Sequence, residues 1–367
     1  MSEILFVTWD GGGNVPPAKV LADELARRGH AVRFVGHEAQ RAALAPHDLT
    51  PYAWRAGFRG KDGHGPATLL SLFSERGAGD DVLASLRERP ADLVVVDCLL
   101  VAVQHACLAA GQPYVALEHL FDSYLRHDWT KAPGALARLR SRSPVKAWDG
   151  AAACLLGSLP SLDEGARTPA GNAHVVGPLL DRLPEPHDLS AHEPTVLVSL
   201  STFGYAGMAQ VLQRILDATA GLDARVVVTT AGMVPTSELR TAGNHEVHAF
   251  VPHDELMPTT SLLVGHGGHA TTMRALAHDV PVLVLPMHPL LDQPLVGRAV
   301  ASAGAGATTS RKTRPPALRS LVTTYLADGP HRTAAARLGR EIRALDGRTG
   351  AADVVGTSIE KVDLKGT

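Results

Sequence analysis

The stretch VGHGGHATTMRALAHDVPVLVLPMHPLLDQP, residues 264–294, decides the fold. It predicts a buried strand that ends at a Gly-rich corner, a helix with its apolar residues on one face, and a second buried strand over residues 281–286. The helix opens directly after the corner, at Thr271 and Thr272. Strands that alternate with helices in this way are typical of a parallel sheet covered by helices.

The Gly-rich corner has the chemistry of a diphosphate site. Glycines let the backbone approach a ligand, and the start of a helix offers unpaired N–H groups with a partial positive charge. The hydroxyls of Thr271 and Thr272 and a ring nitrogen of His266 can donate to the same oxygens. Asp292 and Gln293 follow the second strand, and an acceptor beside an amide suits a polyhydroxylated ring. Without that pair the signal would be weak, because the histidines could equally be core or surface residues.

Outward from this stretch, short apolar runs alternate with helical patterns along both halves of the chain. The expected strands of the first half cover residues 4–8, 32–36, 92–97, 114–117, 153–156 and 174–176. Those of the second half cover residues 195–200, 225–230, 246–250, 261–265 and 281–286. A polar, proline-rich segment, residues 181–194, reads as a linker. The pattern predicts two α/β domains, over residues 1–180 and 195–345, and a C-terminal segment over residues 346–367.

Composition narrows the class of protein. The chain has 367 residues, of which 45% are apolar and 20% charged, and its net charge of -2 predicts no nucleic-acid or anionic-membrane partner. No apolar run is long enough to span a membrane, and the first residues do not resemble a signal peptide. Cys98, Cys107 and Cys154 are widely spaced in apolar surroundings, which predicts buried reduced thiols. We therefore expect a cytoplasmic protein.

A second glycine cluster, WDGGGNVPP, covers residues 9–17 and follows the first strand. It lacks the dinucleotide fingerprint, because Pro16 stands where the third glycine is needed and no acidic residue closes the second strand. The chain has no G-x-x-x-x-G-K-[ST] motif either. The cluster predicts a flexible turn that brings backbone N–H groups and Asn14 to a ligand, and a purely structural tight turn is the alternative.

These pieces together resemble a known family. HGGHATT followed by PMHPLLDQP is similar to the donor-site signature of GT-B glycosyltransferases, in particular the nucleotide-sugar-dependent group that modifies antibiotics and other small molecules. The resemblance implies two Rossmann-like open parallel-sheet domains facing across a cleft, with acceptor binding in residues 1–180 and donor binding in residues 195–345. Residues 346–367 can return to the first domain. Further matching pieces are DGGGNVPP (10–17), VGPLL (176–180), VSLSTF (198–203) and FVPHDELMPTTSLLVGHGG (250–268).

The resemblance also implies a set of site residues. The diphosphate would be held by His266, Gly267, Gly268, His269, Thr271 and Thr272. The sugar would be read by Asp292 and Gln293, the base cradled by Phe250 and Val251, and the site closed by Ser201 and Thr202. The acceptor would meet Gly12 and Gly13 and an aromatic wall from two aperiodic segments, 55–80 and 118–150. That wall would consist of Trp54, Phe58, Phe73, Phe121, Tyr124 and Trp129, some of which can also be plain core.

The implied reaction is an inverting transfer from a dTDP- or UDP-sugar to a hydroxyl, or a carbon, of a hydrophobic aglycone such as a polyketide. A nucleotide-sugar epimerase of the same fold and a non-catalytic nucleotide-sugar-binding homologue are the alternatives. The chain contains no D-x-D, H-E-x-x-H or C-x-x-C motif, so we expect no metal and no cofactor beyond the nucleotide sugar. The sequence leaves a monomer and a homodimer equally open.

The catalytic base is the difficulty. Members of the family usually carry histidine where this chain has Asn14, and an amide cannot deprotonate an acceptor. Asp97 resembles the acidic partner of the missing histidine. The substitutes are Asp10 in the Gly-rich loop, His119 after the strand over residues 114–117, or an acidic acceptor that ionises without a base. The sequence favours Asp10 as base, with Asn14 positioning the acceptor.

Overall fold

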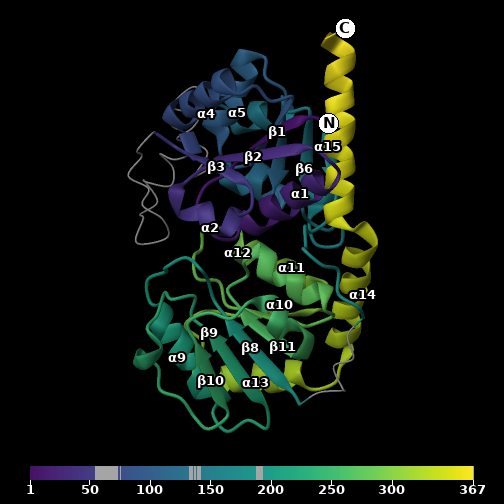
Figure 1. The fold of residues 1–367 in the computed structure, drawn as a ribbon. Helices are drawn as coiled ribbons and strands as arrows, with labels where there is room; N and C mark the ends of the chain where they lie inside the picture. The colour runs from purple at the N-terminus through teal and green to yellow at the C-terminus, as the bar shows by residue number, and fades with distance from the viewer. Residues whose placement is uncertain are drawn as a thin grey trace. The chain divides into compact units, whose positions relative to one another are not determined.

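The structure, a computed structural model, describes residues 1–53, 73–74, 76–131, 135, 138, 142–186 and 193–366. The chain divides into two compact units (Figure 1). The first consists of Met1–Asp181 together with Leu345–Thr367, so the C-terminal helix belongs to the same unit as the N-terminus. The second consists of Arg182–Ala344. Among the described residues, no helix is both long and apolar enough to cross a membrane.

The first unit is built on a parallel sheet of seven strands in the order β3-β2-β1-β4-β5-β6-β7. The sequence predicted six of these strands to within about two residues, but it missed β3, which is four residues long and mostly exposed. The strands are β1 (Glu3–Val7), β2 (Ala31–Gly36), β3 (Asp48–Pro51), β4 (Leu93–Asp97), β5 (Tyr114–Glu118), β6 (Ala153–Leu156) and β7 (Ala173–Val175).

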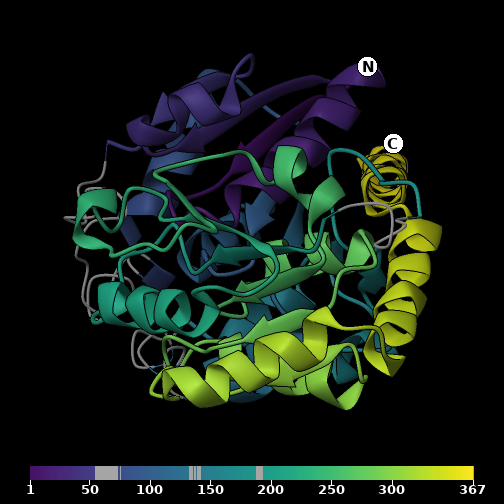
Figure 2. The same cartoon turned by 90° about the horizontal axis from the view of Figure 1, so that it is seen from below.

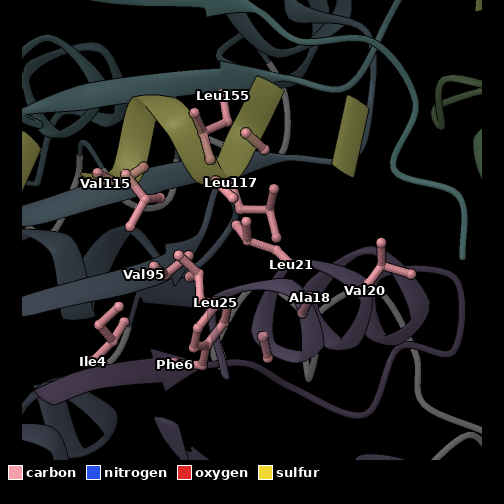
Figure 3. Packing of buried hydrophobic residues seen from close by; sticks show 14 of the residues in the cluster. Ile4, Phe6, Ala18, Val20, Leu21, Leu25, Val95, Val115, Leu117 and Leu155 are labelled. Atoms are coloured by element: carbon pink, nitrogen blue, oxygen red, sulfur yellow. The ribbon is translucent and has the colours of Figure 1, made fainter. Parts of the chain in front are cut away.

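Helices cover both faces of this sheet. On one face, Leu21 and Leu25 of α1 pack against Phe6 and Val95, and α15 closes the same core with Val355 (Figure 3). Helices α4 and α5 pack on each other, and α5 contacts α7. The helices of this unit are α1 (Val15–Arg27), η1 (Glu38–Gln40), α2 (Arg41–Leu44), α4 (Arg76–Glu88), α5 (Val101–Ala110), the π-helix η2 (Tyr124–Trp129), α7 (Pro144–Asp149), α8 (Glu164–Arg167) and α15 (Gly347–Gly366).

The second unit is built on a parallel sheet of six strands in the order β10-β9-β8-β11-β12-β13. Helices α9 and α13 lie side by side on one face of this sheet (Figure 2). The strands are β8 (Thr195–Ser199), β9 (Arg225–Thr229), β10 (His245–His248), β11 (Leu262–Gly265), β12 (Val282–Val284) and β13 (Gly306–Thr308), the last not predicted. The helices are α9 (Met208–Thr219), η3 (Thr236–Glu238), α10 (His253–Leu256), η4 (Met257–Thr259), α11 (His269–Ala277), α12 (Gln293–Ser302), α13 (Pro315–Leu326) and α14 (Pro330–Leu345).

Both sheets have a point where the strand order changes direction, between β1 and β4 in the first unit and between β8 and β11 in the second. The loops at the carboxyl ends of such strands diverge and leave space for a ligand. The two Gly-rich stretches follow β1 and β11, so each unit presents one of them at its own switch point. The prediction of two Rossmann-like parallel-sheet domains is confirmed.

The three cysteines, Cys98, Cys107 and Cys154, are buried and form no disulfide, as expected. Burial raises the pKa of each thiol, to about 12 for Cys107 and well above the ordinary value for Cys98. These side chains are protonated at neutral pH and belong to the apolar core.

Candidate functional site

In the Gly-rich loop of the first unit, the backbone conformation or the close neighbours require glycine at two of the three positions. Gly12 has a positive φ of 81°, a conformation that residues with a Cβ rarely adopt. A Cβ on Gly11 would lie 2.5 Å from the Trp9 ring and 2.8 Å from Oδ1 of Asn14. Gly13 is exposed and has open space around it. The loop is therefore a tight turn with Gly13 at its solvent-facing side.

The side chain of Asn14 connects this loop to the end of β4, which neighbours β1 in the sheet. It sits at the start of α1, is 3% exposed, and its Nδ2 lies 2.9 Å from Oδ2 of Asp97 and 2.9 Å from the carbonyl oxygen of Trp9. Thr8 Oγ1 is 3.2 Å away. Among the described residues, Asn14 Oδ1 has no hydrogen-bond partner. The side chain thus acts through its N–H donors.

Asp97 is the centre of a buried three-residue cluster at the carboxyl ends of β1, β4 and β5. Its Oδ1 accepts from the backbone N–H of Leu99 at 2.9 Å, and its Oδ2 accepts from Asn14 and from Nε2 of His119, the latter at 3.1 Å. Asp97 and His119 are both buried. The parallel register of the strands brings together groups that are 83 and 22 residues apart in the chain. The result is a buried histidine–carboxylate pair formed by His119 and Asp97.

The Sγ of Cys98 lies near this pair, and the ligand atoms of Asp97, Cys98 and His119 lie within 4.8 Å of one another. Such a set could in principle hold a metal ion. A thiol binds metal as its thiolate, whereas burial and the negative Asp97 raise the pKa of Cys98 well above its ordinary value. The chemistry of this donor set therefore fits a proton-transfer pair better than a metal site.

Asp10, the base that the sequence favours, is also buried in the Gly-rich loop. Its backbone N–H donates to Nδ1 of His37 at 3.1 Å, which holds the loop against the turn after β2. The carboxylate that binds His119 is that of Asp97. A role for Asp10 in proton transfer stays a prediction.

The aromatic residues predicted for the acceptor wall are buried in the first unit where the structure describes them. Phe73 packs edge-on against Trp9 of the Gly-rich loop, with ring centroids 5.1 Å apart, and against Trp129 at 6.2 Å. Trp129 in turn contacts Trp148. Phe121 and Tyr124 are buried as well. Trp54 and Phe58 lie outside the described residues. The aromatic row adjoins the loop that carries Asn14, and its contact with an acceptor stays a prediction.

In the second unit, the HGGH corner (residues 266–269) lies between β11 and α11. Gly267 has a φ of 85°, and a Cβ there would lie 2.8 Å from Cγ1 of Val284 and 2.9 Å from the carbonyl oxygen of Gln293. A Cβ on Gly268 would lie 2.6 Å from two atoms of the His266 ring. Gly267 thus lets α12 pack close, and Gly268 makes room for His266.

His266 and the start of α11 form the candidate anion site. Burial lowers the pKa of His266 to about 4, so the ring is neutral at pH 7 and can donate one N–H. His269 is the first residue of the helix, and Thr271 and Thr272 lie in its first turn, Thr272 being buried. The first N–H groups of a helix have no partner within it, which makes this end suitable for phosphate oxygens.

Gln293 begins α12 and is 2% exposed. Its Oε1 accepts from the backbone N–H groups of Met287 at 2.8 Å and His288 at 3.0 Å, and its Nε2 donates to the Tyr205 hydroxyl at 2.9 Å. Both lone pairs of the amide oxygen are used, so the side chain has one N–H to offer a ligand. Its neighbour Asp292 is also buried.

The other predicted donor residues occupy the loops after β8 and β10. Ser201 is half-buried and its Oγ accepts from the N–H of Phe203 at 2.8 Å, while Thr202 is exposed. The strand β10 ends at His248, so Phe250 and Val251 lie in the following loop. The Phe250 side chain is 71% exposed and can stack on a planar group.

Sequence reasoning missed three residues that organise these loops. The Tyr205 hydroxyl accepts from Gln293, Arg311 donates to the carbonyl oxygens of Ala206 and Met287, and Nε2 of His253 lies 3.1 Å from Oγ of Ser199. The only sequence signal was a tyrosine in a Gly-flanked loop after a strand. Its contacts depend on packing between loops 88 residues apart.

Comparison with known proteins agrees with this architecture. The family described as erythromycin biosynthesis protein CIII-like, C-terminal domain, matches residues 213–357. The 4'-demethylrebeccamycin synthase of Lentzea aerocolonigenes is 25% identical over 421 residues, covering 96% of this chain and 99% of the relative. The structure of the calicheamicin glycosyltransferase CalG4 matches with a TM-score of 0.81 and 22% identity over 99% of both chains. The chain has the GT-B fold, and the proteins similar to it in sequence and structure include antibiotic glycosyltransferases.

The structure of the glycosyltransferase VinC in complex with dTDP matches this chain with a TM-score of 0.71 and 21% identity, over 98% of this chain and 100% of VinC. The segment that matches the EryCIII-like family contains the HGGH corner and Gln293. It begins after Tyr205, so the loop that follows β8 lies outside the match.

Proposed function

We propose that this protein transfers a sugar from a dTDP- or UDP-sugar to a hydroxyl or carbon of a small hydrophobic aglycone, with inversion at the anomeric carbon. The observation that carries the proposal is the HGGH corner at the start of α11, with Asp292 and Gln293 at the start of α12. The start of α11 and the neutral donors of the HGGH corner suit the diphosphate. The carboxylate of Asp292 and the amide N–H of Gln293 suit the hydroxyl groups of the sugar. The 4'-demethylrebeccamycin synthase is a relative over nearly its whole length.

In the proposed reaction, the acceptor oxygen forms a bond to the anomeric carbon while the bond from that carbon to the diphosphate oxygen breaks. The electron pair of the broken bond leaves with the nucleoside diphosphate. The N–H groups of α11, Thr271, Thr272 and His266 stabilise the charge that develops there. We propose that these donors neutralise the leaving group without a metal ion.

The acceptor proton goes to His119 in this proposal. Nε2 of His119 stays bound to Asp97 while the ring accepts the proton. The buried carboxylate stabilises the imidazolium that forms, as in other histidine–carboxylate pairs. Asn14 donates to the same Oδ2 and holds the carboxylate in place. This arrangement favours His119 over Asp10.

Mass spectrometry of products tests the function. The protein is offered dTDP- and UDP-sugars together with phenolic and polyketide acceptors. The proposal expects a product that is heavier than the acceptor by one sugar residue. One nucleoside diphosphate should be released for each product molecule. Consumption of the nucleotide sugar without an acceptor would instead indicate an epimerase or a hydrolase. Tight nucleotide-sugar binding without any turnover would indicate a binding protein.

A further inference from the structure

The loops after β8 and β12 are joined by one hydrogen-bonded chain. Nε2 of Gln293 donates to the Tyr205 hydroxyl at 2.9 Å. Arg311 reinforces the junction by donating to Ala206 and Met287, one carbonyl oxygen in each loop, at 3.1 and 3.2 Å. A side chain that the resemblance places at the donor, Gln293, is therefore held from the neighbouring loop by Tyr205.

The protons along this chain have a defined direction. Burial raises the pKa of Tyr205 to about 12, so its hydroxyl keeps its proton at neutral pH. Since the Tyr205 hydroxyl accepts from Nε2 of Gln293, one N–H of the amide is used. Because Oε1 of Gln293 accepts from Met287 and His288, the amide cannot turn over, and its second N–H remains for a ligand.

The ring of Tyr205 also lies against the anion site. Its centroid is 6.3 Å from that of His266 and 6.4 Å from that of His288, which follows β12. The residue thus lies beside the histidine of the candidate anion site and beside Gln293, and is half-buried.

We propose that Tyr205 is a positioning residue for the sugar moiety of the nucleotide sugar: its hydroxyl accepts one N–H of Gln293, so that the other N–H is directed to the ligand. The inference rests on the proposed function. Loss of the Tyr205 hydroxyl leaves this buried amide N–H without its acceptor, although Oε1 of Gln293 keeps its two backbone donors, so the amide binds the sugar less well. The neutral donors of the HGGH corner are unaffected, because the tyrosine ring stays in place.

Calorimetry with two ligands tests the inference. Tyr205→Phe removes one oxygen atom, and Tyr325→Phe, in α13 of the same unit, is the matched control. For Tyr205→Phe we expect the affinity for nucleotide sugar to fall about tenfold while the affinity for the free nucleoside diphosphate changes less than about twofold. Tyr325→Phe should bind both ligands as the parent does. Equal losses for the two ligands, or no loss, would overturn the inference.

A double-mutant cycle gives a second readout. Gln293→Glu keeps an oxygen for Met287 and His288 but replaces the N–H donor by an acceptor. Because Tyr205 acts through Gln293, the double variant should lose less sugar-dependent affinity than the two single losses combined. Additive losses would overturn this inference but would leave the proposed function unaffected. Failure of the parent protein to bind either ligand would overturn the proposed function and this inference with it.

Discussion

The Nε2 of His119 lies 3.1 Å from Oδ2 of Asp97, and both side chains are buried at the carboxyl ends of neighbouring strands, β5 and β4. The same carboxylate oxygen accepts from Asn14. One buried carboxylate is thus shared by an amide from the Gly-rich loop and a histidine that follows β5.

Replacement of His119 should remove the proton acceptor. For His119→Ala we expect kcat to fall by about 10²- to 10⁴-fold for a hydroxyl acceptor, measured by nucleoside diphosphate release. Asp10→Ala is the matched control in the neighbouring loop and should retain most of the activity. A near-normal rate in His119→Ala with a large loss in Asp10→Ala would assign the base to Asp10.

Glu118, next to His119, should make the protein less stable at high pH. Burial and the nearby Asp122 raise the pKa of Glu118 well above its ordinary value in the folded state. The unfolded chain releases this proton near pH 4.5 while the folded chain keeps it, so the contribution of Glu118 to stability falls as pH rises above that value. Glu118→Gln should therefore unfold at a higher urea concentration than the parent at pH 8 and at a similar one at pH 4. The exposed Glu238→Gln is the control and should follow the parent at both values.

His266 should bind the diphosphate as a neutral donor. Its pKa of about 4 means that the ring carries no charge between pH 6 and pH 8. We expect His266→Ala to weaken nucleoside diphosphate binding about tenfold, and by the same factor at both pH values. A clearly larger loss at pH 6 would mean that the imidazolium form binds the ligand.

Gly268 should be intolerant of a side chain for a local reason. A Cβ would come within 2.6 Å of the His266 ring and must displace it, whereas the backbone φ itself is not in the left-handed region. Gly268→Ala is expected to reduce nucleoside diphosphate affinity about as much as His266→Ala, with a thermal unfolding midpoint close to that of the parent. Gly243→Ala, where a Cβ meets no atom within 4 Å, should bind normally. Unchanged binding in Gly268→Ala would contradict the contact between this glycine and His266.

Much of the fold is readable from local patterns. Strand β11, the HGGH corner and helix α11 occur where glycines and apolar periodicity predict them, because these signals act over a few residues. The strands β3 and β13 carry too few buried residues for such a signal, since each is three or four residues long and exists by pairing with a neighbour.

The sequence by itself determined two α/β domains, a Gly-rich turn that ends in Asn14, and a corner suited to a diphosphate. It could not decide which side chain partners Asp97, and it ranked Asp10 above His119. Nor did it find that Gln293 is held by Tyr205. Those relationships depend on strand order and register, which bring residues from distant parts of the chain to the carboxyl edge of one sheet. Periodicity carries no information about contacts of that range, so only the tertiary structure decided them.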